Sequence, residues 1–488
     1  MTPLELTKKR YDEAIPFKRY FLLIANNIVK LAVQLAVLLL YARMLSIHEY
    51  GIYQTVWLFV NVISVFALFG LPNLILTYGR GVIFNWIACN KRLVAVHLVL
   101  LHLISGICFF LNDFLYSWQN IILIYFLIIL QCLATIAETL SIKQDRDIRV
   151  VIVNIISALL FLSAHVLVLY FGYSLPLLLI QLLFIQLFKL ILLSPRGVSA
   201  ERVPSLRGLG RQWMYLGLVD SLSVLYKWLD KWIILFFISV SQFAIYLNGS
   251  YEIPIFLLMV SAVGNVLLVE LSKTPFPTKD KIKSLFTNTT LLLAAFVFPS
   301  FAFLFFYHEP FFLLIFGEQY RNALPIFVIS IFIIPLRIIN YTALLQAYGR
   351  NDLVLRGVLI DLSAAILIML ILYPWQGVAG IAVAFVASTY LQSGFYLWHT
   401  VKLTRIPLGE FFPLKKLSTN FLLSFIVSGL MYIFIEYLLK DYLLISGLII
   451  CLIICLSILR WLRKDVFWPV AKSFSLFGQV QASQKRKP

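Results

Sequence analysis

Charged residues are scarce in this chain of 488 residues. Asp, Glu, Lys and Arg make up 13% of the sequence, with 22 acidic against 40 basic residues, whereas 61% of the residues are hydrophobic. The mean hydropathy is +0.94. Since a soluble domain usually carries about 25% charged residues, this composition excludes a soluble globule and predicts a polytopic membrane protein.

Several kinds of chemical site are also missing from the sequence. The five cysteines and six histidines are scattered, without the spacing of a disulfide framework or a metal site. No glycine-rich run ends in Gly-Lys-Ser or Gly-Lys-Thr, which argues against ATP hydrolysis by this chain. No serine, histidine and aspartate can be argued into a catalytic group. We therefore expect transport without covalent chemistry, and neither a metal nor a cofactor.

Long apolar runs dominate what is present. Each run is close to the ~20 residues that cross about 30 Å of hydrocarbon, and helices are expected because lipid cannot satisfy backbone amides. Fourteen spans are predicted, at residues 21–42, 52–77, 93–111, 121–140, 150–170, 174–193, 213–238, 247–271, 284–307, 324–345, 353–372, 377–401, 417–438 and 442–459.

Lysine and arginine residues gather in the two tails and in every second loop between these spans. Short loops rich in Lys and Arg stay in the cytoplasm, so both termini are expected there. The net charge of +18 then faces anionic headgroups, and nucleic acid is not an expected partner. The basic first twenty residues precede no small-residue cleavage site, so we expect no cleavable signal peptide. All outer loops are short, which argues against an external catalytic domain.

A short internal repeat suggests two halves. The run Leu45-Ser46-Ile47-His48-Glu49-Tyr50-Gly51-Ile52-Tyr53 follows the first span, and Ile238-Ser239-Val240-Ser241-Gln242-Phe243-Ala244-Ile245-Tyr246 follows the seventh. Parallel halves place a substrate path between them near the membrane midplane. The expected segments are a cytoplasmic N-terminal segment (1–20), an N-lobe of six spans (21–193), a basic inter-lobe loop (194–212), a C-lobe of six spans (213–401), two additional spans (402–459) and a basic cytoplasmic tail (460–488).

Lys30 lies near the middle of the first span. A charge at mid-bilayer costs about 3 kcal/mol, so such a residue usually meets a partner or a polar cavity. Asn26, Lys30 and Gln34 follow one another at four-residue spacing and predict one polar stripe. The stripe is either a hydrogen-bonded seam between helices or the wall of a hydrated cavity, and the ammonium of Lys30 favours the cavity.

Other charges inside the spans leave two interpretations open. In the seventh span, Asp220, Lys227 and Lys231 share a face with Asp230, and they either line a cavity or neutralise one another. Arg337, in the tenth span, offers a planar fork suited to phosphate oxygens. Its alternative is an ion pair with Asp361 in the eleventh span or Glu252 in the eighth. Together these basic and acidic residues can build a polar cavity, and its net charge depends on which of them form ion pairs.

The run from Arg43 to Tyr53 resembles the signature that follows the first helix of polysaccharide flippases, which belong to the multidrug/oligosaccharidyl-lipid/polysaccharide exporter superfamily. The run from Leu45 to Gly51 is the most specific match. Weaker matches follow in order along roughly residues 15–402, at Gly70-Leu71-Pro72, Asp230-Lys231, Phe316-Gly317, Gly349-Arg350 and Gly377 with Gly380.

The resemblance implies an all-α polytopic membrane protein with two six-helix lobes in pseudo-twofold arrangement and two C-terminal helices. It implies alternating-access translocation of a polyprenyl-diphosphate-linked oligosaccharide to the outer leaflet of a bacterial inner membrane. The products would be lipopolysaccharide O-antigen, capsule or related surface polysaccharide, with a polymerase and chain-length components as partners.

Lys30 and Lys227 or Lys231 match the positions thought to meet the diphosphate. Asp220 and Asp361 are candidates for a coupling H+ or Na+. The alternatives are a multidrug/cation antiporter of the same fold and a membrane polymerase or glycosyltransferase.

Overall fold

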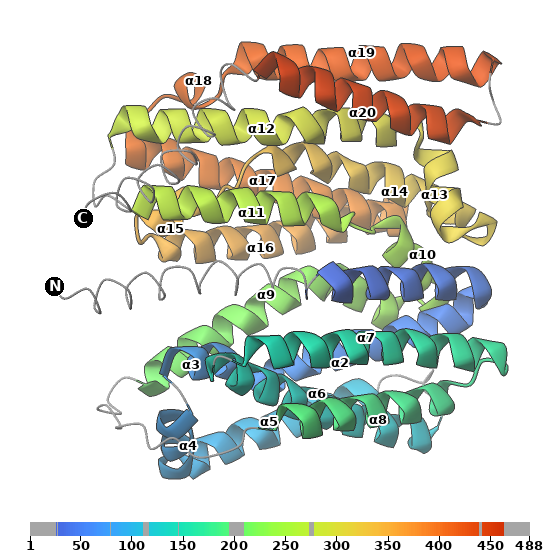
Figure 1. Cartoon of the computed structure of the whole chain (residues 1–488), viewed down its shortest axis with the longest axis vertical. Helices are drawn as coiled ribbons and strands as arrows, with labels where there is room; N and C mark the ends of the chain where they lie inside the picture. The colour runs from blue at the N-terminus through green and yellow to red at the C-terminus, as the bar shows by residue number, and fades with distance from the viewer. Residues whose placement is uncertain are drawn as a thin grey trace, which may run out of the picture. The chain divides into compact units, whose positions relative to one another are not determined.

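The computed structural model of the chain describes residues 26, 28–78, 80–110, 117–144, 146–194, 209–272, 278–438 and 442–462. These residues form helices and short connections, with no strand among them (Figure 1). The chain divides into two compact units, Met1–Ala244 and Ile245–Pro488, which are described separately below. The expected N-terminal segment, residues 463–488 of the expected tail and most of the inter-lobe loop lie outside the described residues.

The first unit is built on the α6 helix. A helix at residues 28–44 precedes the labelled elements. The helices that follow are α2 (Ile47–Leu68), α3 (Leu71–Tyr78), α4 (Arg80–Cys89), α5 (Lys91–Phe110), α6 (Trp118–Lys143), α7 (Asp147–Tyr170), α8 (Leu175–Leu193) and α9 (Leu209–Phe237). The α6 helix packs against α8, α2 and α3, and α9 packs against α2 and α3.

The second unit continues after α10 (Val240–Gly249), a helix that crosses the division between the units. Its elements are α11 (Pro254–Ser272), α12 (Lys279–Phe306), α13 (His308–Phe316), η2 (Glu318–Ala323), α14 (Leu324–Ser330), η3 (Ile331–Ile338), α15 (Ala343–Ala347), α16 (Asn351–Gln376), α17 (Val378–Thr404), α18 (Leu408–Phe411), α19 (Leu414–Leu438) and α20 (Leu443–Leu462). The α16 and α17 helices pack along each other, and α19 and α20 both pack on α12.

The predicted all-α membrane architecture is confirmed, but the count of fourteen spans is not. Within the described residues, ten helices are long and apolar enough to cross a membrane, or eleven if a bent pair counts as one span. That pair is α10 with the start of α11, where the chain bends by 54°. The predicted span 324–345 is interrupted too, since it contains α14, the 3-10 helix η3 and α15. Pro335 lies inside η3, where its ring removes a backbone donor.

The internal repeat is a repeat of local structure. Ser46 caps α2: its Oγ accepts from the backbone N–H of Glu49 at 3.3 Å, and the Glu49 carboxylate accepts from the backbone N–H of Ser46 at 3.1 Å. This reciprocal pair is a capping box. In the second copy, Ser239 precedes α10 and accepts from the backbone N–H of Gln242 at 3.1 Å. Both copies therefore begin a helix with the same serine-based cap.

Glycine allows two close approaches within the first unit. Gly70 separates α2 from α3 with a φ of +76°, which disfavours a side chain, and its backbone lies against that of Gly217 in α9. Gly51 brings the start of α2 onto the start of α10, where a Cβ would meet both the side chain and the carbonyl oxygen of Val240 at 2.6 Å. The two repeated segments thus touch at a position that only glycine fits.

Candidate functional site

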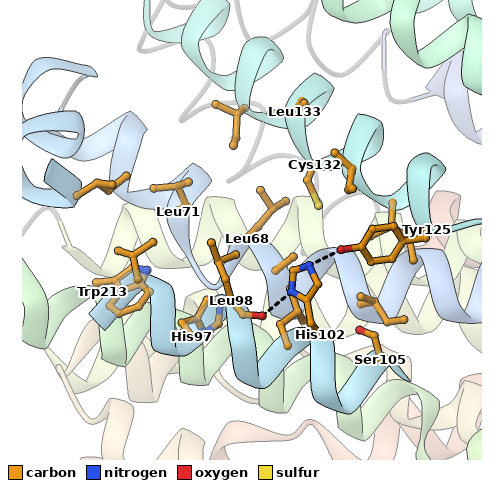
Figure 2. Close-up of a pocket in the computed structure, with 18 of the residues that line it drawn as sticks. Leu68, Leu71, His97, Leu98, His102, Ser105, Tyr125, Cys132, Leu133 and Trp213 are labelled. Carbon is orange, nitrogen blue, oxygen red and sulfur yellow. Dashed lines mark hydrogen bonds between the residues drawn. The ribbon is translucent and has the colours of Figure 1, made fainter. Parts of the chain in front are cut away.

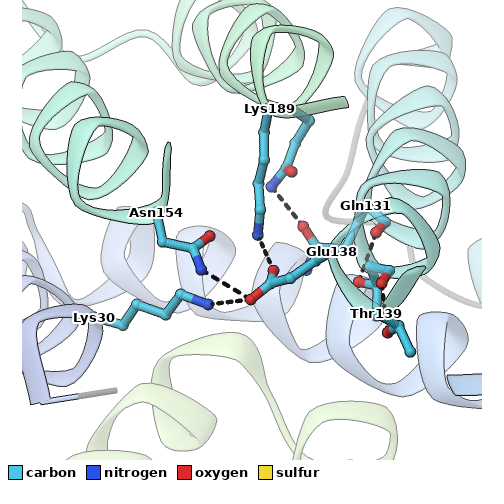
Figure 3. A network of polar contacts seen from close by, with 8 residues as sticks. Lys30, Gln131, Glu138, Thr139, Asn154 and Lys189 are labelled. Carbon is cyan, nitrogen blue, oxygen red and sulfur yellow. Dashed lines mark hydrogen bonds and ion pairs between the residues drawn. The ribbon is translucent and has the colours of Figure 1, made fainter. Parts of the chain in front are cut away.

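A cluster of charged side chains joins four helices of the first unit (Figure 3). Lys30 reaches from the helix at residues 28–44 to Glu138 on α6, where its Nζ donates to Oε1 at 2.9 Å. Asn154 on α7 donates to the same oxygen at 2.9 Å. Lys189 on α8 donates to the other oxygen, Oε2, at 2.5 Å. One carboxylate therefore accepts from two ammonium groups and one amide.

The cluster carries a net charge of +1, because two lysines share one glutamate. The side chains of Glu138 and Lys189 are 17% and 14% exposed, whereas that of Lys30 is 32% exposed. Ionised groups of this burial need close partners to offset the loss of hydration. Glu138 accepts hydrogen bonds from three donors, and Lys30 is the more exposed of the two cations that it pairs with.

The predicted stripe on the first helix divides into residues of different surroundings. Asn26 is buried, and its Oδ1 accepts no hydrogen bond from the described residues. Gln34 is exposed. Lys30 lies between them in burial and turns toward α6. The structure therefore joins Lys30 to a polar cluster, rather than placing all three residues in one site.

The charged residues of α9 have different surroundings. Asp230 is buried and forms an ion pair with its neighbour Lys231 at 3.0 Å. Lys227 is exposed, with its Nζ 5.8 Å from the ring centre of Trp228, within the range of a cation–π contact. Asp220 accepts from the amide of Asn73 on α3 at 3.3 Å.

In the second unit, Arg337 on η3 pairs with Glu252, one of the two partners considered for it. The Nε of Arg337 is buried and donates to no described residue. Asp361 on α16 is fully buried and interacts electrostatically with Tyr396 of α17. A guanidinium with a spare donor can bind a further anion or a sugar hydroxyl.

Glu138 and Lys189 were missed in the sequence. They lie within the predicted spans 121–140 and 174–193 and interrupt them just as Lys30 interrupts the first. The signal was present, because each charge inside an apolar run needs a partner or a polar cavity, and two basic residues and one acidic residue in three such runs can pair with one another. Sequence spacing could not show that α6 and α8 pack closely enough for all three to meet.

A separate cavity of about 310 Å³ lies in the first unit among α2, α3, α4, α5, α6 and α9. Its wall is mostly leucine, isoleucine, valine and tryptophan. Figure 2 shows two polar contacts among the lining residues: His102 binds the carbonyl oxygen of Leu98 within α5 and the hydroxyl of Tyr125 on α6. The described residues include no group of His, Cys, Asp and Glu suited to a metal ion. This cavity suits hydrocarbon rather than a phosphate.

Comparison with known proteins places this geometry in context. The model of a family described as polysaccharide biosynthesis protein matches residues 40–325. No curated protein sequence matches the chain. The fold is similar to that of the lipid II flippase MurJ in an inward closed conformation, with a TM-score of 0.66 and 13% identity over 92% of this chain and 100% of that chain.

The fold is also similar to an inward-facing multidrug resistance MATE family transporter of the MOP superfamily. The TM-score is 0.54 and the identity 12%, over 78% of this chain and 98% of that chain. At such identities the likeness concerns the fold alone. The resemblance inferred from the motifs is confirmed. The chain is a multi-pass membrane protein whose fold is that of the MurJ and MATE transporters. Because the family model matches more than half of the chain, the chain belongs to the polysaccharide biosynthesis protein family.

Proposed function

We propose that the protein moves a polyprenyl-diphosphate-linked oligosaccharide repeat unit from the cytoplasmic to the outer leaflet. It does so by alternating access and without covalent chemistry, for the synthesis of a surface polysaccharide such as O-antigen or capsule. The observation that carries the proposal is the cationic cluster in which Lys30 and Lys189 share Glu138. Family membership supports the polysaccharide pathway.

The chemistry of the cluster supports a diphosphate as its ligand. A diphosphate carries several negative charges and only acceptor oxygens, so it needs ammonium or guanidinium donors. In an apolar surrounding, the excess positive charge is screened much less than it would be in water. Lys30 supplies that charge from the most exposed position of the cluster. Asn26, Gln34, Lys227, Lys231 and Arg337, which were named from the sequence, are proposed as further substrate contacts outside this cluster. The Nε of Arg337 donates to no described residue.

The proposal includes a bacterial inner-membrane location with both termini in the cytoplasm. It also includes coupling to an H+ or Na+ gradient through Asp220 and Asp361, and cooperation with a polysaccharide polymerase and chain-length components. The half-buried Asp220 and the fully buried Asp361 are the acidic groups on which this coupling depends.

The buried Asp361 also favours a second candidate, an ion-coupled multidrug/cation antiporter. A site for organic cations requires net negative charge, whereas the cluster around Glu138 carries one positive charge in excess. The flippase is therefore the better supported of the two. A drug-sensitivity phenotype with unchanged surface glycan would favour the antiporter instead.

The test follows lipid-linked glycans in a strain that lacks the gene. The strain is complemented with wild-type protein, with Lys30→Ala or with Lys283→Ala, and the leaflet that holds the polyprenyl-diphosphate glycans is determined. Lys283 is the matched control, because it also forms an ion pair with a carboxylate, Glu410, but both side chains are about half exposed. We expect cytoplasmic accumulation and loss of surface glycan with Lys30→Ala, and rescue with Lys283→Ala. Rescue by Lys30→Ala at equal expression would refute the proposed site.

A further inference from the structure

The carboxylate of Glu138 uses its two oxygens separately. Oε1 accepts from Lys30 and Asn154, each at 2.9 Å, and Oε2 accepts from Lys189 at 2.5 Å. Lys30 is therefore one of two donors on its oxygen, whereas Lys189 occupies the other oxygen (Figure 3). The three donors come from three different helices, so the loss of one contact does not by itself displace the other two donors.

The consequences of losing each lysine differ. If Lys30 turns away, Asn154 still donates to Oε1 and Lys189 still neutralises the charge, so no buried carboxylate is left without a partner. If Lys189 is removed, Lys30 becomes the only cation in this cluster, and separating it leaves an uncompensated buried charge, which is strongly unfavourable. Lys189 and Asn154 thus make the contact between Lys30 and Glu138 easy to break.

We propose that Glu138 is a release latch for Lys30. In the resting site Lys30 is held by Glu138; when a diphosphate arrives it takes over Lys30, and Glu138 stays neutralised by Lys189 and hydrogen-bonded to Asn154. Glu138 then recaptures Lys30 and helps the diphosphate to leave. Lys189 and Asn154 are positioning residues that act through Glu138. The inference rests on the proposed function, because it names how the same site binds and releases its diphosphate.

The latch predicts that substitutions of Glu138 and of Lys189 change the affinity for diphosphate in opposite directions, which a purely structural ion pair does not. Glu138 competes with the diphosphate for one ammonium group, so removing Glu138 must tighten diphosphate binding and slow release. Removing Lys189 must weaken binding, because Glu138 then holds Lys30 more firmly. A structural cluster predicts weaker binding or misfolding for either change.

The experiment measures binding of farnesyl diphosphate to the purified full-length protein in lipid nanodiscs by titration calorimetry. Farnesol, which lacks the diphosphate, is titrated in parallel to subtract apolar binding. The variants are Lys30→Gln, Glu138→Gln, Lys189→Gln and the double variant Glu138→Gln/Lys189→Gln. We expect Kd to fall about tenfold for Glu138→Gln and to rise about tenfold for Lys189→Gln, each close to 1.4 kcal/mol.

The double variant is decisive because it removes both charges that face each other. If Lys189 acts through Glu138, the substitution of Lys189 has little further effect once Glu138 is glutamine, and the double variant still binds more tightly than wild type. If Lys189 contacts the diphosphate directly, its loss weakens binding in both backgrounds, which overturns the latch. The double variant also leaves no unpaired charge from this pair, so it remains measurable if Glu138→Gln alone does not fold.

Turnover provides a second readout. In vesicles that translocate a fluorescent polyprenyl-diphosphate probe, Glu138→Gln is expected to lower both KM and the maximal rate, since release becomes slow. Loss of binding in Lys30→Gln together with weaker binding in Glu138→Gln would overturn the latch and leave the proposed function standing. Unchanged binding in Lys30→Gln would overturn the proposed function, and the latch with it.

Discussion

Replacing Gly51 with alanine places a methyl group between α2 and α10. The new Cβ would lie 2.6 Å from the Cγ1 of Val240 and 2.6 Å from its carbonyl oxygen. The methyl group of Val240 can rotate away, but the carbonyl oxygen belongs to the backbone and moves only with the helix. The two helices must therefore separate by several tenths of an ångström, at the place where the two copies of the repeat touch.

The expected magnitude follows from two opposing effects. Overfilling a packed contact costs about 1–3 kcal/mol, whereas alanine is favoured over glycine inside a helix by about 1 kcal/mol. Gly106, on α5 of the same unit, isolates the second effect, because no described atom would lie within 4 Å of a Cβ there. The free energy of unfolding of Gly51→Ala should therefore be about 1–3 kcal/mol below that of Gly106→Ala.

Thermal unfolding of the detergent-purified variants, followed by tryptophan fluorescence, measures this difference. For a unit of this size, 1 kcal/mol corresponds to about 2–4 °C, so Gly51→Ala should unfold between about 2 and 12 °C below Gly106→Ala. Adding Val240→Ala removes the side-chain part of the overlap. In a double-mutant cycle, Gly51→Ala should therefore lower the free energy of unfolding by less when residue 240 is alanine than when it is valine. If Gly51→Ala stabilises the protein as much as Gly106→Ala does, the close approach of α2 and α10 is wrong.

Three further predictions concern the cap formed by Ser46, the acidic residues Asp220 and Asp361, and the ion pair of Arg337 with Glu252. Ser46→Ala removes the capping box of α2 and should lower stability by about 1 kcal/mol in the same unfolding assay; an unchanged Tm would contradict the cap. Asp220→Asn and Asp361→Asn should each uncouple transport from an imposed H+ or Na+ gradient in vesicles, and gradient-dependent transport as in wild type would rule out their role in coupling. Arg337→Gln leaves only the part-exposed Glu252 without its partner, so stability should fall by less than about 1 kcal/mol while transport falls severalfold; equal transport would remove Arg337 from the site.

The sequence predicts the helical architecture well where local signals decide it. Hydrophobic runs near twenty residues locate α6, α7, α8, α16, α17, α19 and α20, because each is a single unbroken helix. Interruptions are harder to foresee, since they depend on close tertiary approach. Gly70 breaks the run predicted at 52–77 against the backbone of Gly217, which lies far along the chain.

The candidate site is only partly predictable for a similar reason. Lys30 could be singled out because one charge inside an apolar run requires an explanation. Its partner could not be chosen from spacing, since Glu138 follows 108 residues later and meets it only through the packing of the helix at 28–44 on α6. The pairing of Arg337 with Glu252 rather than Asp361 is likewise decided by which helices are neighbours.

The shared carboxylate has an evolutionary consequence. Among related chains, Glu138 and Lys189 should be gained and lost together, because Lys189 alone leaves an uncompensated charge between α6 and α8, and Glu138 without Lys189 keeps Lys30 from its ligand. Lys30 is under no such constraint and can persist where both are replaced by apolar residues. An alignment of relatives should therefore show strong covariation between positions 138 and 189, and a weaker dependence of position 30 on either.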